Sequence, residues 1–256
     1  MGFSRIMAAN DGTDLGRHAV QVGRAIADRA GARLVEVYVE TRSLPPSRDG
    51  RRPAQPPSPS AGVLWREGVP GVEITRCAEE WGADLLVLGR RLPNTPDGLG
   101  PTTETVLRRR RGPTLLAPVG IQCFRRVVFA LDGTERGLRI LPGAGPAAAA
   151  TGAVPLALCV LPRDTYDLAG DPRWGDPRRV LVEGAMARHP ELGGPDVLRV
   201  RQGPPVSEIL QHLAEVEADL LVLGIRQGGP GGDPGSGHVA RDLLRVVPTA
   251  VLAVPI

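Results

Sequence analysis

Short, almost purely apolar runs alternate along the chain with longer stretches in which apolar residues recur every three or four positions. Near the start, the apolar runs 5–10 and 33–39 flank an amphipathic stretch that follows Asp11-Gly12-Thr13 and ends before Gly31. Apolar runs joined by amphipathic helices are typical of parallel strands covered on both faces. A polar turn before a helix and a glycine after it mark its two ends. We therefore predict an α/β fold that begins with a strand, a helix over residues 14–30 and a second strand.

The same alternation continues to the C-terminus. Further strands are predicted over residues 63–67, 84–88, 113–119, 126–131, 157–161, 197–201, 219–223 and 249–254. Further helices are predicted over residues 71–81, 103–111, 136–151 and 178–189. Proline and glycine interrupt the stretch 136–151, so we expect a kink or a break in that helix. Residues 41–62 are rich in Pro, Ser and Arg, so we expect the first half to lack the helix that 178–189 forms in the second.

The chain contains an internal repeat. The sequence ADLLVLG, which begins at Ala83, returns at Ala218, and the Asp-Gly-Thr turn at Asp11 returns at Asp132. Matching residues flank these blocks in both halves: Gly68, Glu73, Ile74, Pro113 and Thr114 correspond to Gly203, Glu208, Ile209, Pro248 and Thr249. A repeat far longer than a solenoid unit indicates duplicated globular domains. We predict one domain over residues 1–121 and a second over residues 122–256.

Composition limits the classes of function. A length of 256 residues with 42% hydrophobic content fits two compact domains. No apolar run approaches the roughly 20 residues that a membrane helix needs. The first residues lack the pattern of a signal peptide, so we expect a cytoplasmic protein. The net charge is only +3 and aromatic residues make up 3% of the chain, which argues against a nucleic-acid interface.

Candidate chemistry is sparse. The three cysteines, Cys77, Cys123 and Cys159, show no CxxC spacing and lie in or beside apolar segments, so we expect buried, reduced thiols. His18, His189 and His212 have no second ligand at helical spacing, so no metal site is expected. The basic run 108–111 is interpreted as a solvated helix end. The sequence lacks the usual phosphate-binding and nucleophile motifs, so no enzyme is expected.

Two copies of strand, Asp-Gly-Thr, helix and strand, each with a later ADLLVLG strand, resemble the tandem universal stress proteins. The final segment VPTAVLAV, from Val247 to Val254, fits the same pattern. The resemblance implies two Rossmann-like (adenine nucleotide alpha hydrolase-like) domains, each a five-stranded parallel sheet of order 3-2-1-4-5. It also implies an intramolecular pseudo-dimer in which the last strands, 114–119 and 249–254, pair. The resemblance does not decide whether two such chains associate further into a homodimer.

The resemblance further implies a regulatory or chaperone-like binder of an unknown protein partner, with ATP or AMP as ligand in many members. In the second half, the positions that match the family's nucleotide site are Asp132, Val160, Gly224, Gly237 and His238. The loop from Gly224 to His238 keeps the residue spacing of the family pattern, although Gln227 replaces a glycine and His238 replaces a hydroxyl residue.

In the first half the matching positions are Asp11, Val39, Gly89 and Thr103, and more of the glycine pattern is lost. We therefore expect at most one degraded site, more in the second half than in the first. Asp11 and Asp132 have an alternative role in capping the first helix of each half. The alternative functions are a nucleotide-independent partner-binding protein and, with less support, an ATP-hydrolysing enzyme.

Overall fold

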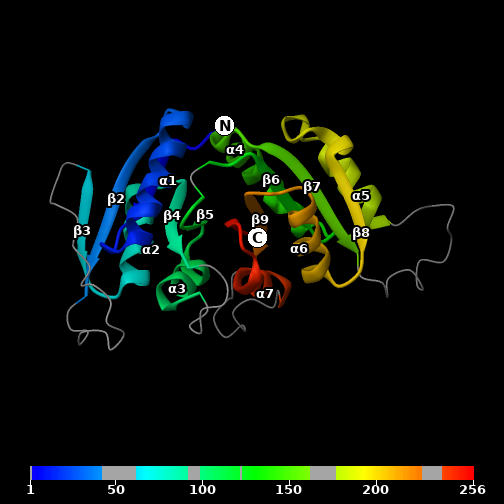
Figure 1. Cartoon of the computed structure of the whole chain (residues 1–256). Coiled ribbons are helices and arrows are strands. Elements are labelled where there is room, and N and C mark those ends of the chain that lie inside the picture. Colours follow the sequence, from blue (N-terminus) through cyan, green and yellow to red (C-terminus); the bar gives the residue numbers. More distant parts are fainter. Residues whose placement is uncertain (1, 42–61, 92–98, 122, 162–176, 227–237) are drawn as a thin grey trace.

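The structure is a computed structural model that describes residues 2–41, 62–91, 99–121, 123–161, 177–226 and 238–256. We call the part up to residue 121 the first lobe and the part from residue 123 the second lobe (Figure 1). The segment in which we expected a missing helix falls on residues 42–61, outside the described residues. The division between residues 121 and 122 stays a prediction.

The first lobe alternates strands and helices as the hydrophobic pattern predicts. Its elements are β1 (Arg5–Ala9), α1 (Asp14–Ala30), β2 (Arg33–Glu40), β3 (Val63–Glu67), α2 (Pro70–Trp81), β4 (Leu85–Arg90), α3 (Pro101–Arg109) and β5 (Thr114–Pro118). Helix α1 has the predicted ends: the side chain of Thr13 caps it, and Gly31 closes it with a left-handed φ of 65°.

The second lobe repeats this order with one more described helix. Its elements are β6 (Arg126–Leu131), η1 (Gly137–Ile140), α4 (Leu141–Thr151), β7 (Val154–Leu161), α5 (Pro177–Ala187), η3 (Pro190–Leu192), η4 (Gly194–Val197), β8 (Leu198–Gln202), α6 (Pro205–Glu215), β9 (Leu220–Ile225), α7 (His238–Val246) and β10 (Ala250–Pro255). The expected interruption of 136–151 is a 3-10 turn before residue 141. Helix α4 then continues through Pro146, so the break lies before that proline and not at it.

Within the described residues, ten strands form one sheet in the order β3-β2-β1-β4-β5-β10-β9-β6-β7-β8. Each lobe is parallel and has the order 3-2-1-4-5, as predicted. The two lobes join where β5 and β10 pair antiparallel, with Leu116 opposite Val251 and Thr114 opposite Ala253. This confirms the expected pairing of the last strands.

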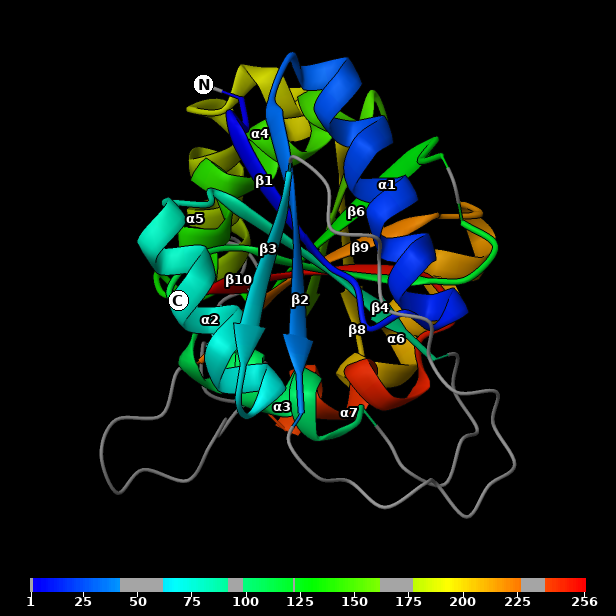
Figure 2. The same ribbon diagram turned by 90° about the vertical axis from the view of Figure 1, so that its left-hand side faces the viewer.

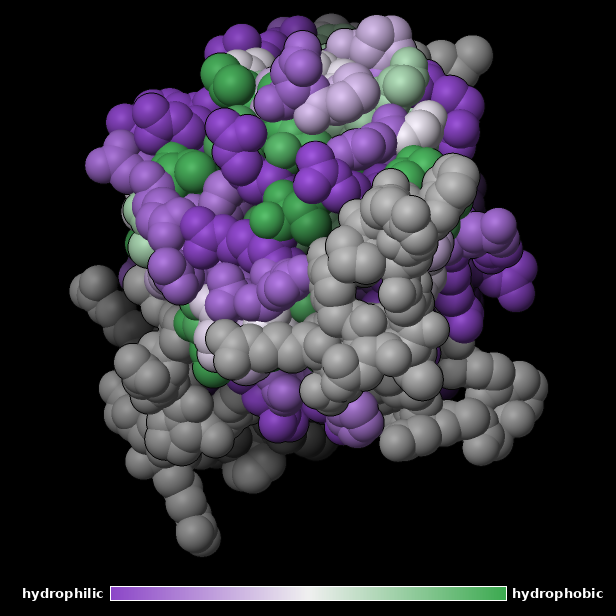
Figure 3. All heavy atoms as spheres, turned by 90° about the vertical axis from the view of Figure 1, so that its right-hand side faces the viewer, coloured by the Kyte–Doolittle hydropathy of each residue, from purple (hydrophilic) through white to green (hydrophobic). Residues whose placement is uncertain are grey.

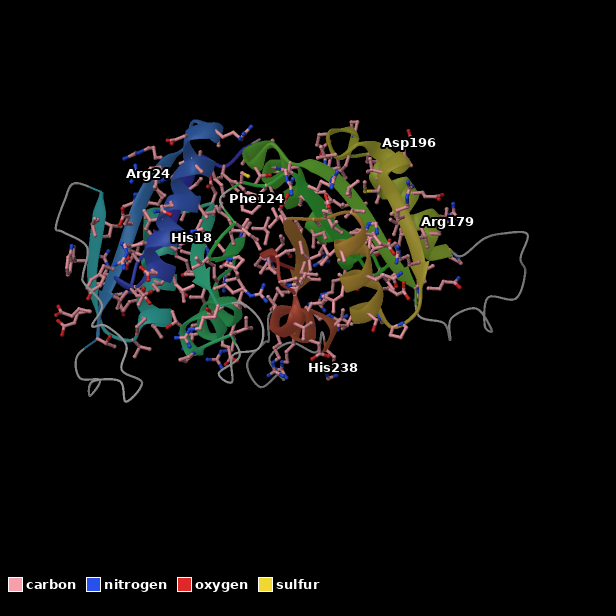
Figure 4. All side chains as sticks on the ribbon, in the orientation of Figure 1. His18, Arg24, Phe124, Arg179, Asp196 and His238 are labelled. Atoms are coloured by element: carbon pink, nitrogen blue, oxygen red, sulfur yellow. The ribbon has the colours of Figure 1, made fainter. Side chains whose placement is uncertain are left out.

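Both faces of the sheet are covered, and both cores cross the junction between the lobes. Helices α1, α4 and α5 cover one face, and α2, α3, α6 and α7 cover the other. Figure 2 shows α1 and α2 on opposite sides of the first-lobe strands. Residues of both lobes share each hydrophobic cluster. Phe124, which precedes β6, is 7% exposed and lies between the lobes (Figure 4). Hydrophobic burial therefore holds the two lobes together as one body.

The outer edge of the second lobe, where β8 and α5 lie, is mainly hydrophilic with small, separate hydrophobic patches (Figure 3). The prediction of three buried thiols is wrong for one of them: Cys77 and Cys159 are buried, whereas Cys123 is exposed. Cys123 lies in the connection between β5 and β6, beyond the last apolar strand of the first lobe. No helix of the described residues is long and apolar enough to cross a membrane.

Candidate functional site

A cavity of about 660 Å³ opens in the first lobe at the carboxyl ends of β1, β2 and β4. Its lining includes Asp11, Val39, Gly89 and Thr103, which are all four first-lobe residues that the sequence comparison selects. Strands β1 and β4 are neighbours in the sheet, and the chain leaves them in opposite directions. Such a switch point is where open α/β sheets bind ligands. The volume is in the range of small-molecule and cofactor sites.

The Asp11 carboxylate is held in place by the turn before α1. Its Oδ1 accepts hydrogen bonds from the backbone N–H of Thr13 at 3.0 Å and from the Thr13 hydroxyl at 2.5 Å. The Thr13 hydroxyl in turn accepts from the N–H of Gly16 at 3.2 Å. Thr13 is thus the N-cap, and Asp11 orients it. The aspartate is exposed, so its carboxylate remains accessible to a ligand in the cavity.

Gly89 allows β4 to approach the start of α1 closely. A Cβ at this position would lie 2.5 Å from the carbonyl oxygen of Leu15. Any larger residue would push the first turn of α1 away from the strand. The glycine therefore has a packing role here as well as a place in the cavity wall.

Helix α3 begins at the cavity. Gly100 is the N-cap, with a φ of 78° and no side-chain hydrogen bond, and Pro101 occupies the first helical position. Thr102 and Thr103 follow, and both line the cavity. The positive end of the helix dipole and the amides of the first turn favour an anion there. Arg91 also lines the cavity and adds a cation to this wall.

The opposite wall carries polar groups from β1 and β2. Asn10, 8% exposed, accepts a hydrogen bond from the N–H of Gly12 at 2.9 Å and donates one to Glu36 at 3.2 Å. Tyr38 lines the cavity, and its ring lies 4.6 Å from that of Trp65. Burial, together with the charges of Glu40 and Asp11, raises the pKa of Tyr38, so its hydroxyl remains protonated at neutral pH.

The second lobe repeats the turn. Asp132 Oδ1 accepts from the N–H of Thr134 at 3.0 Å and from its hydroxyl at 2.7 Å. Val160 is buried in β7, and Gly224 lies in β9 against Ile140 and Ile256. His238 begins α7 and is exposed (Figure 4). Gly237 lies outside the described residues, so the second-lobe site stays a prediction.

The polar wall is not repeated. At the positions of Asn10, Glu36 and Tyr38, the second lobe has Leu131, Ala157 and Cys159. All three are buried and belong to a hydrophobic cluster. The motif comparison missed Asn10 and Tyr38, because it considered only positions at which the family pattern has a defined residue. The difference in polarity between the two halves at these positions is the signal that could have found both residues.

The described residues contain no group of three or more His, Cys, Asp or Glu side chains that could hold a metal ion. The three histidines named from the sequence lie apart. His18 is buried on α1, His212 is buried on α6, and His189 shares a hydrogen bond of 2.8 Å with Glu191.

The two lobes are Rossmann-like and joined through their last strands, and the first has a cavity at its switch point. They define a tandem α/β protein. The sequence model of the universal stress protein family matches residues 49–118 and 124–255 of the chain. The chain belongs to the universal stress protein family.

Solved structures support this fold along the whole chain. A functionally unknown protein from Pseudomonas aeruginosa PAO1 is similar, with a TM-score of 0.70, 16% identity, and coverage of 99% of this chain and 92% of that one. A putative universal stress protein from Pseudomonas aeruginosa UCBPP-PA14 has a TM-score of 0.69 and 16% identity, covering 99% and 93%. A universal stress protein from Archaeoglobus fulgidus DSM 4304 has a TM-score of 0.67 and 17% identity, covering 98% of each chain. No curated protein sequence matches the chain.

Proposed function

We propose that this tandem universal stress protein is a non-enzymatic regulatory binder, and that its first lobe takes one adenine nucleotide, such as AMP or ATP. The observation that supports this most is the cavity of about 660 Å³, which brings together Asp11, Val39, Gly89 and Thr103. These residues come from four separate segments of the chain. The glycine pattern in the loop after β9 favoured the second lobe, whereas the geometry of the described residues favours the first.

The two ends of the cavity suit the two ends of a nucleotide. The N-terminus of α3 and Arg91 offer positive potential for phosphate. The Asp11 carboxylate, at the end of β1, suits ribose hydroxyl donors. Val39, Ile74 and Leu88 give an apolar surface for a planar base. The ligand thus has a charged end, a hydrogen-bonding centre and an apolar face.

The test compares matched variants in the two lobes. Purified protein is titrated with AMP and with ATP in a calorimeter, and nucleotide released by denaturing the protein is measured by chromatography. We expect about one nucleotide per chain. Asp11→Asn should weaken binding at least tenfold, because the carboxylate loses its charge while the turn keeps its shape. Asp132→Asn, the same change in the second lobe, should leave affinity and stoichiometry unchanged.

Three results would speak against the proposal. If neither nucleotide binds, the chain is a nucleotide-independent partner-binding protein. If Asp132→Asn abolishes binding while Asp11→Asn does not, the site lies in the second lobe. Multiple turnover of ATP that Asp11→Asn removes would identify an enzyme.

A further inference from the structure

The side chain of Arg90 crosses from the first lobe into the second. Its Nη2 donates to the carbonyl oxygens of Leu244 at 2.7 Å and Val247 at 2.9 Å, and its Nη1 donates to that of Thr249 at 2.9 Å. Arg90 is the last residue of β4, whereas its three acceptors lie at the end of α7 and just before β10. One guanidinium therefore ties the end of a first-lobe strand to the end of a second-lobe helix.

This contact satisfies groups that neither lobe satisfies alone. The last carbonyls of α7 have no partner within the helix, and they form the negative end of its dipole. Pro248 follows the helix end and cannot donate an N–H. Arg90 is only 5% exposed, and burial lowers its pKa to about 10, which leaves it charged at neutral pH. A buried cation is tolerated where acceptors surround it.

Arg90 also lies between two residues of the cavity wall. Gly89 and Arg91 line the cavity, and the strand register places Gly89 opposite Ala117 and Arg90 opposite Pro118. Because successive residues of a strand point to opposite faces, fixing the side chain of Arg90 fixes the backbone that presents its two neighbours. The anchor for this part of the cavity is thus in the other lobe.

The contact is not symmetrical. The repeat places Ile225 at the position of Arg90, at the end of β9. An isoleucine side chain cannot donate hydrogen bonds to the end of α3, so this anchor is not repeated at position 225. The asymmetry falls in the same lobe as the described cavity.

We infer that Arg90 is a positioning residue for the first-lobe ligand site, and that the second lobe, through the end of α7, is a structural part of that site. The inference rests on the proposed function for the identity of the ligand. The structural part of the inference does not depend on the ligand. It states that the hydrogen bonds from Arg90 to the end of α7 keep the end of β4 in position. The tandem arrangement then supplies one complete site in place of two equivalent ones.

The test uses the full chain and measures amide hydrogen exchange by mass spectrometry, without ligand and with saturating AMP. Arg90→Met keeps an unbranched, flexible side chain but cannot donate hydrogen bonds. Without ligand it should speed exchange at least tenfold at 89–91 as well as at the end of α7. Arg90→Lys, which can still donate to the carbonyls, should restore part of the protection. Ile225→Met, the same replacement at the repeat position, should leave both regions unchanged.

Ligand binding gives a second readout. At a temperature at which all variants are folded, Arg90→Met should raise the dissociation constant for AMP at least tenfold, whereas Ile225→Met should not. In the wild type, AMP should slow exchange at the end of α7, and Arg90→Met should remove that effect. Faster exchange at α7 with an unchanged β4 end would overturn the inference, because Arg90 would then only cap the helix. Absence of AMP binding to the wild type would count against the proposed function, while the exchange without ligand still decides the role of Arg90.

Discussion

A Cβ atom on Gly16 would lie 2.5 Å from Oδ1 of Asp11 and 2.6 Å from its backbone nitrogen. The carboxylate and the turn therefore occupy the space that any side chain at position 16 would need. Gly16 lies in the first turn of α1, where its N–H bonds to the capping Thr13. The absence of a side chain at this position is what lets Asp11 lie beside the helix start.

We predict that Gly16→Ala weakens AMP binding by about tenfold, which corresponds to about 1.4 kcal/mol. The added methyl group displaces the Asp11 carboxylate from its place in the cavity. Calorimetric titration measures the affinity, and thermal unfolding shows whether the protein remains folded.

The control is the same change in the second lobe. A Cβ on Gly137 would clash with Oδ1 of Asp132, so the added methyl group meets the corresponding carboxylate. If the site is in the first lobe, Gly137→Ala lowers stability without changing affinity. Equal losses of affinity from both variants would contradict this assignment.

The close contact between α2 and α3 gives a second prediction. A Cβ on Gly71 would lie 2.6 Å from the Cβ of Thr105 and 2.9 Å from the carbonyl oxygen of Thr102, which lines the cavity. Gly71→Ala should therefore destabilise the fold by about 1–3 kcal/mol, because the two helices must separate. Denaturant unfolding measures the change.

Gly184 on α5 is the matched control. A Cβ there meets only the Nη1 of Arg188, at 4.0 Å. Gly184→Ala should stabilise the protein by roughly 0.5–1 kcal/mol, because alanine loses less backbone entropy in a helix. Opposite signs for these two Gly→Ala changes are the expected result. A stabilising effect of Gly71→Ala would contradict the prediction, because α2 and α3 would then accommodate the added methyl group without separating.

The periodic segments could be predicted closely, because the signals for them are local. The cap residue Thr13 and the left-handed Gly31 mark both ends of α1, and β3 and β6 have the predicted bounds. Helix α3 begins two residues before its predicted start. The prediction placed Pro101 in the preceding loop, although proline is well tolerated at the first helical position.

The site was less predictable because its contacts are not local. Asn10 and Tyr38 line the same cavity as Thr102 only because of the order of the strands in the sheet, so a comparison of loop glycines could not select them. The acceptors of Arg90 lie more than 150 residues further along the chain. In sequence, Arg90 is one of two arginines after an apolar strand, and nothing there indicates burial.

The thiols give a third prediction. In native protein, a thiol reagent should modify one cysteine per chain rapidly, because Cys123 is exposed while Cys77 and Cys159 are buried. Burial also raises the pKa of Cys77, which lowers its thiolate fraction further. Cys123→Ser should remove the rapid phase, and unfolding should expose the remaining two thiols. A second rapid thiol in the native wild type would contradict the described burial.

Acid sensitivity is expected from His212 on α6, which is 4% exposed and has no hydrogen bond to either ring nitrogen. Burial, and then the charge of Arg201, lower its pKa; Glu215 raises it and Arg199 lowers it further. The imidazole is therefore neutral in the folded protein at neutral pH. The unfolded chain binds a proton near pH 6.5, its ordinary pKa, and the folded chain binds it only at lower pH.

The sign of the effect follows from this difference. The contribution of His212 to stability is complete above about pH 6.5 and is lost progressively as the pH falls towards the lowered folded pKa. The first lobe has Cys77 at the repeat position, so His212→Cys gives a packed, uncharged replacement. Over pH 7.5 to about pH 5, the free energy of unfolding should fall less steeply in His212→Cys than in the wild type, as measured by urea unfolding at each pH. A parallel pair of curves would show that His212 does not titrate with folding, because the two proteins would then bind the same number of protons on unfolding.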